Sequence, residues 1–410
     1  MKARITIIAA ALSALMLLSA GCKKHSFFRI VPGEQIHFRA KSQPSTGDPG
    51  SRSVYSGQYF SVDGYANQFE RIDWDEGDMI SIGYVSFGGP DGLCVEYDHY
   101  RLKDITSDGK SSFANTIEPT GGPMGLNGLN WRDNTHHRFL ATHPAIDDDD
   151  EDFVFGVVDN EFTVKCPYRY PEIQIPVGTE EKTITFCGEE ATATVYKPDM
   201  SYAYQFCNPF EYYSREGLLD EKYSPADGMY LESGTTINLP FEPHFTAFEI
   251  TAAAKEGDSF TLNSVTLTSS DEARPLTGTY IFQLFNVEED DSEYWTDVPK
   301  EGEVSYQAII NFTNLTLSDE NPIVFTYILN AKQDFTNLTI TFNITSNDVT
   351  FNRSLKLQYA NQEWISFYGT LKHRITNLRV PVSIELGTLW YASDGAGNYL
   401  DGGDPFDGEI

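Results

Sequence analysis

The sequence predicts an all-β protein made of two β-sandwich domains, with long loops and little helix. Three observations lead to this fold class. Aromatic residues make up 13% of the 410 residues, with 23 Tyr and 27 Phe, and aromatic side chains favour strands. The 32 Gly and 20 Pro supply many turns. After Pro240, apolar residues alternate with Thr, Ser or Asn, which is typical of strands with one buried face and one face in water.

The strands expected after Pro240 are separated by clusters of turn residues, as in an antiparallel sandwich. They cover residues 244–251, 260–268, 323–329, 337–345 and 378–386. Pro381 cannot donate a backbone hydrogen bond, so we expect the last of these strands at a sheet edge or a bulge. In the first half of the chain, residues 36–40 and 79–84 are expected to form short strands between long loops.

The N-terminus has the features of a bacterial lipoprotein signal. Lys2 and Arg4 precede an apolar run over residues 5–18 that is too short to span a membrane. The residues Leu-Ser-Ala-Gly before Cys22 resemble a lipobox, so we expect cleavage after residue 21 and a lipid anchor on Cys22 in the outer membrane. An ordinary signal peptide followed by an incidental cysteine is the alternative.

The predicted organisation has four parts. They are a signal peptide over residues 1–21, a lipidated tether with the first strand over 22–54, and β-sandwich domains over 55–239 and 240–410. The tether prediction rests on the Pro-, Ser- and Gly-rich composition of residues 43–50.

The charge balance excludes one class of partner. Lys and Arg number 29 against 60 Asp and Glu, which gives a formal net charge of −31. This charge repels phosphate backbones, so we expect no nucleic acid partner. The acidic run from Asp147 to Asp152 is expected to be a solvated loop, because it lacks the spacing of an EF-hand; a calcium-binding loop is the alternative.

The sequence contains no local motif of a hydrolase elbow, a zinc-binding HExxH helix, a P-loop or a dinucleotide turn. We therefore expect neither enzymatic activity nor a cofactor. The cluster most similar to a metal site consists of Asp133, His136, His137 and His143. Adjacent histidines on a strand point to opposite faces, so we expect no metal there.

Four cysteines follow the predicted lipid site, in a chain expected to reach an oxidising compartment. They allow three disulfide connectivities, and buried free thiols are the alternative. These residues are Cys94, Cys166, Cys187 and Cys207.

Several short motifs follow one another in order along most of the chain. They are Val54-Tyr-Ser-Gly57, Trp74-Asp-Glu-Gly77-Asp78-Met-Ile80, Trp131, Phe139-Leu-Ala141-Thr-His-Pro144, Met200-Ser-Tyr-Ala203, Leu239-Pro-Phe241-Glu-Pro-His244 and Leu276-Thr-Gly278. In this order they resemble the fimbrillin (Mfa-like) family of pilus and surface lipoproteins of Bacteroides-type anaerobes.

The resemblance implies transthyretin-like topology in both sandwich domains and export as a lipoprotein. In polymerising members it also implies that a protease cuts after a basic residue and removes an N-terminal strand, so that a strand of the next subunit can bind. On that scheme the strand over residues 36–40 is removed. Arg52 is the expected processing site, with Arg39 and Lys41 as competitors; an uncut flexible tether is the alternative.

We therefore expect a non-catalytic, lipid-anchored fimbrial subunit or surface adhesin. Its expected partners are other fimbrial subunits or further copies of itself, the outer membrane and a host or glycan ligand. Shaft, tip, anchor and non-polymerising roles all stay open. The alternative is a glycan-binding surface lipoprotein of a polysaccharide uptake system, in which aromatic side chains stack on sugar rings. The candidate aromatics are Tyr97, Tyr100, Trp295 and Trp390.

Overall fold

The computed structural model describes residues 33–42, 54–61, 68–108, 111–121, 127–134, 136–147, 149–158, 161–213, 229–230, 236–270, 272, 275–284, 295–330, 338–356, 372–382, 392–394 and 399–400. Every helix or strand assigned in these segments is a strand, so the predicted all-β class is confirmed. None of the described segments is a helix that is long and apolar enough to cross a membrane. The predicted signal peptide, Cys22 and Arg52 lie outside the described residues.

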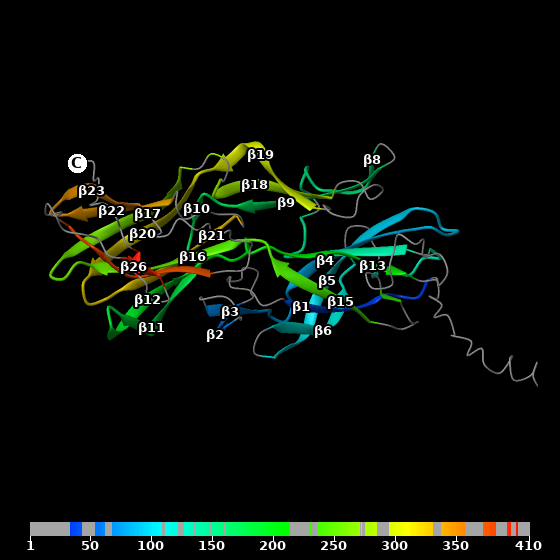
Figure 1. The fold of residues 1–410 in the computed structure, drawn as a ribbon, viewed down its shortest axis with the longest axis horizontal. Coiled ribbons are helices and arrows are strands. Elements are labelled where there is room, and N and C mark those ends of the chain that lie inside the picture. Colours follow the sequence, from blue (N-terminus) through cyan, green and yellow to red (C-terminus); the bar gives the residue numbers. More distant parts are fainter. Residues whose placement is uncertain are drawn as a thin grey trace, which may run out of the picture.

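One sheet closes on itself and occupies one end of the molecule (Figure 1). Its strands are β1 (His37–Ser42), β4 (Met79–Phe87), β5 (Cys94–Ser107), β6 (Ser112–Pro119), β7 (His136–His143), β13 (Gln205–Tyr213), β14 (Met229–Tyr230) and β15 (Thr236–Pro243). They follow the order β14-β13-β15-β1-β6-β5-β4-β7, and an additional pairing joins β7 to β13. We call the closed part of this sheet, from β13 through β1 to β7, the ring.

The inside of the ring is filled by aromatic and aliphatic side chains. A hairpin of β2 (Val54–Ser61) and β3 (Gln68–Asp73) leads into it, and Trp74 follows as a buried anchor. The Trp74 ring packs edge-on against Phe241, with 5.4 Å between ring centroids. Gly77 turns the chain into β4 with a φ of 97°, a conformation that glycine adopts without a Cβ penalty.

Two further sheets form the other end of the molecule (Figure 1). The five-stranded sheet has the order β10-β20-β17-β22-β23, and its strands are β10 (Ile173–Gln174), β17 (Ser259–Ser269), β20 (Gln307–Ser318), β22 (Leu338–Ser346) and β23 (Val349–Lys356). The seven-stranded sheet has the order β11-β12-β21-β16-β24-β25-β26, and its strands are β11 (Gly178–Phe186), β12 (Glu189–Lys197), β16 (Thr246–Ala254), β21 (Ile323–Leu329), β24 (Lys372–Val380), β25 (Ala392–Asp394) and β26 (Tyr399–Leu400). One hydrophobic core contains residues from both sheets.

The burial patterns agree with the predicted alternation in the five-stranded sheet and differ from it in the other. In β17 and β22, Leu262 and Phe342 are buried while the neighbouring Thr and Asn residues are only half-buried. All seven residues of β21 are buried instead. The reason is that β21 lies between two cores, since Phe325 belongs to the core of the two sheets and Ile328 to a second core.

The second core lies against a four-stranded sheet with the order β19-β18-β9-β8. Its strands are β8 (Val154–Val158), β9 (Glu161–Tyr170), β18 (Thr277–Leu284) and β19 (Trp295–Ser305). Aromatic rings dominate this core; Phe206 of β13 stacks on Phe282 of β18 with 4.2 Å between centroids. Because Phe206 also belongs to the ring's β13, this aromatic contact joins the ring to the four-stranded sheet.

Strand pairing crosses the domain boundary predicted near residue 240. Strands β9 to β12 precede that residue in the chain, yet β9 pairs with β18, β10 with β20 and β12 with β21. Conversely, β15 spans the boundary and belongs to the ring. The division into 55–239 and 240–410 therefore stays a proposal about the chain, while the sheets themselves share strands across it.

Two finer predictions about the chain have clear outcomes. Pro381 directly follows the last residue of β24, Val380, and has no N–H to extend the ladder. β24 lies between β16 and β25, but β25 pairs only with Ile375 and Thr376, and the ladder with β16 has a register shift between Ile375 and Leu378. In the acidic run, Asp150 pairs with Arg169 at 2.9 Å and Asp152 with Lys300 at 2.7 Å, so part of this loop is held on the four-stranded sheet.

Candidate functional site: the seat of the first strand

Strand β1 is bonded on both sides and thereby completes the ring. On one side it pairs in parallel with β15 over its whole length, from His37 opposite Thr236 to Ser42 opposite Phe241. On the other side it pairs antiparallel with β6, where Ala40 lies opposite Ala114. Without β1, both β15 and β6 would become sheet edges with unpaired backbone groups.

The inward side chains of β1 form part of the ring's core. Phe38, Ala40 and Ser42 of β1, and Ile36 directly before it, are all buried, in alternation with outward residues. The Phe38 ring meets Tyr100 and Phe139 edge-on, with centroid distances of 5.5 and 5.7 Å. Burying Ile36 and Phe38 stabilises this arrangement by about 1.5–3 kcal/mol each.

The outward side chains of β1 include one of the predicted processing sites. Arg39 is exposed, and both Arg39 and Lys41 lie over the ring of Phe113, each at 5.3 Å from its centroid. The peptide bond after Arg39 lies inside the strand, between residues paired with β15. A protease needs an extended segment free to enter its cleft, and a backbone within a ladder is not free in this sense.

The residues before β1 are held by a second segment, residues 127–134, which we call the clamp. The Gly33 N–H donates to the carbonyl of Trp131 at 2.8 Å, and the Ile36 N–H donates to the carbonyl of Leu129 at 2.9 Å. In return, the Trp131 N–H donates to the carbonyl of Glu34 at 2.9 Å. The clamp thus extends the pairing of the first strand beyond the end of β6.

Side chains of the β4–β5 hairpin fix the clamp almost residue by residue. The Gly128 N–H donates to Asp98 Oδ2 at 2.9 Å, and the Leu129 N–H donates to the Tyr100 hydroxyl at 2.8 Å. The Tyr84 hydroxyl lies 2.9 Å from both the Asn130 carbonyl and Glu96 Oε2. The clamp is therefore positioned by strands of the ring itself.

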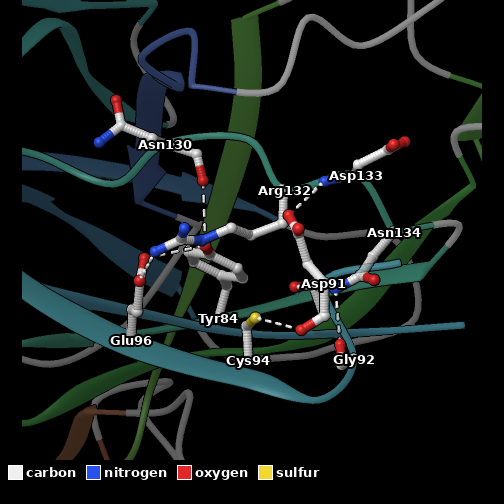
Figure 2. A network of polar contacts seen from close by, with 10 residues as sticks. Tyr84, Asp91, Gly92, Cys94, Glu96, Asn130, Arg132, Asp133 and Asn134 are labelled. Carbon is white, nitrogen blue, oxygen red and sulfur yellow. Dashed lines mark hydrogen bonds and ion pairs between the residues drawn. The ribbon is translucent and has the colours of Figure 1, made fainter. Parts of the chain in front are cut away.

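The network continues to the end of the clamp through charged and amide groups (Figure 2). Arg132 forms an ion pair and a hydrogen bond with Glu96, and the Asp133 N–H donates to Asp91 Oδ2 at 2.8 Å. Asn134 Nδ2 donates to the carbonyl of Gly92 at 2.8 Å. These bonds connect the loop between β4 and β5 to the clamp.

The tyrosines of this network stay protonated. Burial, together with the negative charge of Glu96, raises the pKa of Tyr84 well above its ordinary value. Burial likewise raises the pKa of Tyr100. Both groups therefore act as neutral hydroxyls that order the clamp, and neither is arranged to accept a proton from a substrate.

Two described histidines of the suspected metal cluster, His137 and His143, do not converge. His137 is buried, with its ring 5.0 Å from that of Trp131. His143 lies at the other end of β7, where its Nε2 is 3.6 Å from Asp78 Oδ2. His137 and His143 are six positions apart on β7, which places their rings about 20 Å apart. The side chain of His136 lies outside the described residues, and the described part of the chain contains no group of three or more potential ligands placed to hold a metal ion.

Of the aromatic residues suspected of stacking on sugars, the two that the structure describes, Tyr97 and Tyr100, do not form a platform. Tyr100 is buried in the ring, with an exposed fraction of 1%. Tyr97 packs edge-on against Phe153, with 5.2 Å between centroids. Trp390 and the side chain of Trp295 lie outside the described residues. The two described candidates thus serve packing.

All four cysteines after the predicted lipid site are free thiols. Cys166 and Cys207 are buried, Cys94 is half-buried and Cys187 is exposed at the β11–β12 turn. Burial raises the pKa of Cys166 to about 12, which keeps this thiol protonated. The alternative of buried free thiols thus holds for Cys166 and Cys207, whereas Cys94 and Cys187 are free but not buried.

Sequence reasoning found β1 by its alternation but missed the clamp. The clamp has no periodic pattern, since its contacts run through backbone groups and scattered side chains. Trp131, which the motif comparison selected, was the only signal at this position.

No protein-family model matches this chain, and no curated protein sequence matches it. Solved structures do match along most of its length. A candidate cell adhesion protein from Bacteroides uniformis is 11% identical, with a TM-score of 0.40, over 89% of this chain and 98% of its own. One from Bacteroides ovatus is 13% identical, with a TM-score of 0.41, over 89% and 97%. The tip fimbrial protein Mfa3 from Porphyromonas gingivalis is 8% identical, with a TM-score of 0.25, over 78% and 95%. The chain is similar to these adhesion and fimbrial proteins in structure.

Proposed function

We propose that this chain is a fimbrial subunit or surface adhesin that is anchored in the outer membrane by lipid on Cys22 until it is processed, and in which β1 is then exchanged for a strand of another subunit. The observation that supports this function is the place of β1 in the ring. It is bonded to β15 and β6 on its two sides, and it is the first strand of the described chain. Because all other strands of the ring follow β1 in the chain, removal of β1 opens the ring and leaves those strands in one continuous chain.

The opened ring would present two kinds of recognition to an incoming strand. The edges of β15 and β6 offer unpaired backbone groups, which supply affinity in β-augmentation. The space vacated by Ile36 and Phe38 offers apolar pockets for alternate side chains, which supply specificity. Both contributions are lost while the slot is empty, so an empty ring is unstable and favours capture of a strand.

The position of the basic residues favours Arg52 as the processing site. A cut after Arg52 falls between β1 and β2 and separates all of β1 from the rest of the chain. A cut after Arg39 or Lys41 would instead divide β1 itself, inside its ladder with β15. We propose that processing occurs after Arg52 and that β1 then leaves in exchange for a donor strand.

The test uses the mature chain with Cys22→Ser, so that lipid does not cause aggregation. Trace trypsin is added, the fragments are identified by mass spectrometry, and unboiled samples are run on gels. We expect release of the segment ending at Arg52, followed by SDS-resistant ladders. Arg52→Gln should prevent both, while Arg39→Gln, the matched control, should change neither. A chain that is cut after Arg52 and stays monomeric would exclude the strand-exchange function.

A further inference from the structure

The outer face of the five-stranded sheet carries a regular array of uncharged polar side chains. In one row, residues on β20, β17, β22 and β23 lie side by side in register, and all four are threonines. They are Thr316, Thr261, Thr345 and Thr350. The inward neighbours on these strands, such as Leu262 and Ile344, are buried in the core, so the threonines face outward.

The next rows have the same character. The second row consists of Asn311, Ser264, Asn343 and Asn352, in register across the same four strands. The third row contains Thr266, Thr341 and Ser354, and it ends on Ile309 and Ile173 at the β10 edge. Rows on one face of a sheet lie ~7 Å apart and strands ~4.8 Å apart, so the array covers a flat area of roughly 14 by 14 Å. We call this array the hydroxyl–amide face.

Hydrogen bonds between neighbouring strands hold the side chains of this face in place. Asn343 Nδ2 donates to Asn352 Oδ1 at 2.8 Å, and the hydroxyl groups of Thr345 and Thr350 form a hydrogen bond of 2.8 Å. Each hydroxyl offers one donor and two acceptor positions, and each amide two donors and two acceptor positions. Asn263 Nδ2 also donates to Asn343 Oδ1 and to Thr345 Oγ1, each at 2.9 Å, so Asn343 and Thr345 make two bonds each. The donor and acceptor positions that these bonds leave over belong to side chains whose rotamer entropy is already reduced.

The absence of charge in these three rows contrasts with the rest of the chain. Asp and Glu number 60 in the sequence, and the exposed β11–β12 hairpin carries Glu180, Glu181, Glu189 and Glu190. Strands in general favour Thr and disfavour Asp and Asn, so the row of Asn residues is more unusual on this face than the lack of acids. The face presents neutral donors and acceptors within an acidic protein.

We propose that the hydroxyl–amide face binds a neutral polysaccharide. A neutral polyhydroxylated chain matches the alternating donors and acceptors, and it meets no repulsion from a protein with a net charge of −31. The edge formed by Ile173, which is 52% exposed, and Ile309 offers apolar contact to the C–H faces of sugar rings.

The test is native affinity electrophoresis of the intact mature chain, with Cys22→Ser, through gels that contain a neutral polysaccharide. Dextran, galactomannan, xyloglucan and hydroxyethyl cellulose serve as neutral probes, and polygalacturonate serves as the acidic comparison. We expect at least one neutral polymer to retard the chain and polygalacturonate to leave it unretarded. The double substitution Asn311→Asp and Asn352→Asp places two carboxylates in the second row without changing its shape, and it should weaken binding about tenfold or abolish it.

A control variant separates the face from general charge effects. Thr179→Glu and Thr183→Glu add the same two charges on the exposed strand β11, and they should leave retardation unchanged. No retardation by any neutral polymer, or equal retardation of both variants, would overturn the proposal. Sedimentation that shows self-association abolished only by the Asn→Asp pair would also overturn it, because the face would then be an interface between copies. None of these outcomes depends on strand exchange, since β1 lies in the ring at the other end of the molecule (Figure 1).

Discussion

Replacing Phe38 by alanine tests whether β1 is seated in the ring's core. Phe38 is 4% exposed and contacts the rings of Tyr100 and Phe139. Truncation of a buried Phe to Ala costs about 3–5 kcal/mol, from lost transfer free energy and the cavity that is left. At about 1.4 kcal/mol per factor of ten, the opening equilibrium of β1 should rise by about 100-fold or more.

The assay is hydrogen exchange followed by mass spectrometry, which reports local opening separately for each peptide. Amides in the peptide over residues 33–42 should exchange about 100-fold faster in Phe38→Ala, whereas a peptide over β22, in a separate core, should keep its rate. His37→Ala, at an exposed position on the same strand, is the matched control and should change little. Acceleration of less than tenfold at residues 33–42 would refute the argument that Phe38 holds the strand.

Three further measurements test other parts of the structure. Burial raises the pKa of Tyr84 from an ordinary value of 10.0, so above pH 10 the unfolded chain loses a proton that the native chain keeps. The free energy of unfolding should therefore fall above pH 10. In urea melts between pH 8 and 11, Tyr84→Phe should reduce the slope of the free energy of unfolding against pH. Cys187 should react with Ellman's reagent in the native chain and Cys166 only in denaturant; native reaction of Cys166 would contradict its burial. The Gln174 side chain donates to the carbonyl of Ile328 at 2.6 Å and accepts from its N–H at 2.9 Å. Gln174→Ala leaves both buried backbone groups unpaired, so it should lower the free energy of unfolding in urea by about 2–5 kcal/mol. A loss below about 1 kcal/mol would show that water replaces the amide.

The sequence predicts individual strands well because alternation is a local property. β17, β21 and β22 lie within a residue or two of their predicted ranges, and β1 follows the alternation of residues 36–40. Alternation says which side chains share a face, but it does not say which strand lies alongside. β1 pairs with β15 about two hundred residues later, and only tertiary structure reveals that this pairing closes the ring.

The candidate site was predictable to a smaller extent than the strands. The clamp is held by side chain to backbone bonds, such as Leu129 to Tyr100, which leave no periodic trace in the sequence. The role of Gln174 was hidden for the same reason, since a single buried amide replaces a strand partner for Ile328. The doubly buried β21 shows a further limit, because a strand between two cores reads as one continuous apolar run.

In the proposed exchange, the place of β1 between β15 and β6 restricts which strand can replace it. A donor must run parallel to β15 and antiparallel to β6 to restore both ladders, because β1 does so now. It must also present large apolar side chains at the positions of Ile36 and Phe38 and a small one at that of Ala40, which is fully buried and would be overpacked by a larger residue.

At the position of Ser42, a donor needs a short hydroxyl side chain. Ser42 Oγ accepts from the Ser112 N–H at 2.8 Å inside the protein, and an apolar replacement would leave that donor unpaired. A donor strand therefore needs two large apolar side chains, a small one and a hydroxyl side chain at alternate positions. This is a stricter requirement than apolar alternation alone. Because backbone pairing accepts any sequence, it is these four pockets that would let the ring distinguish one subunit's strand from another.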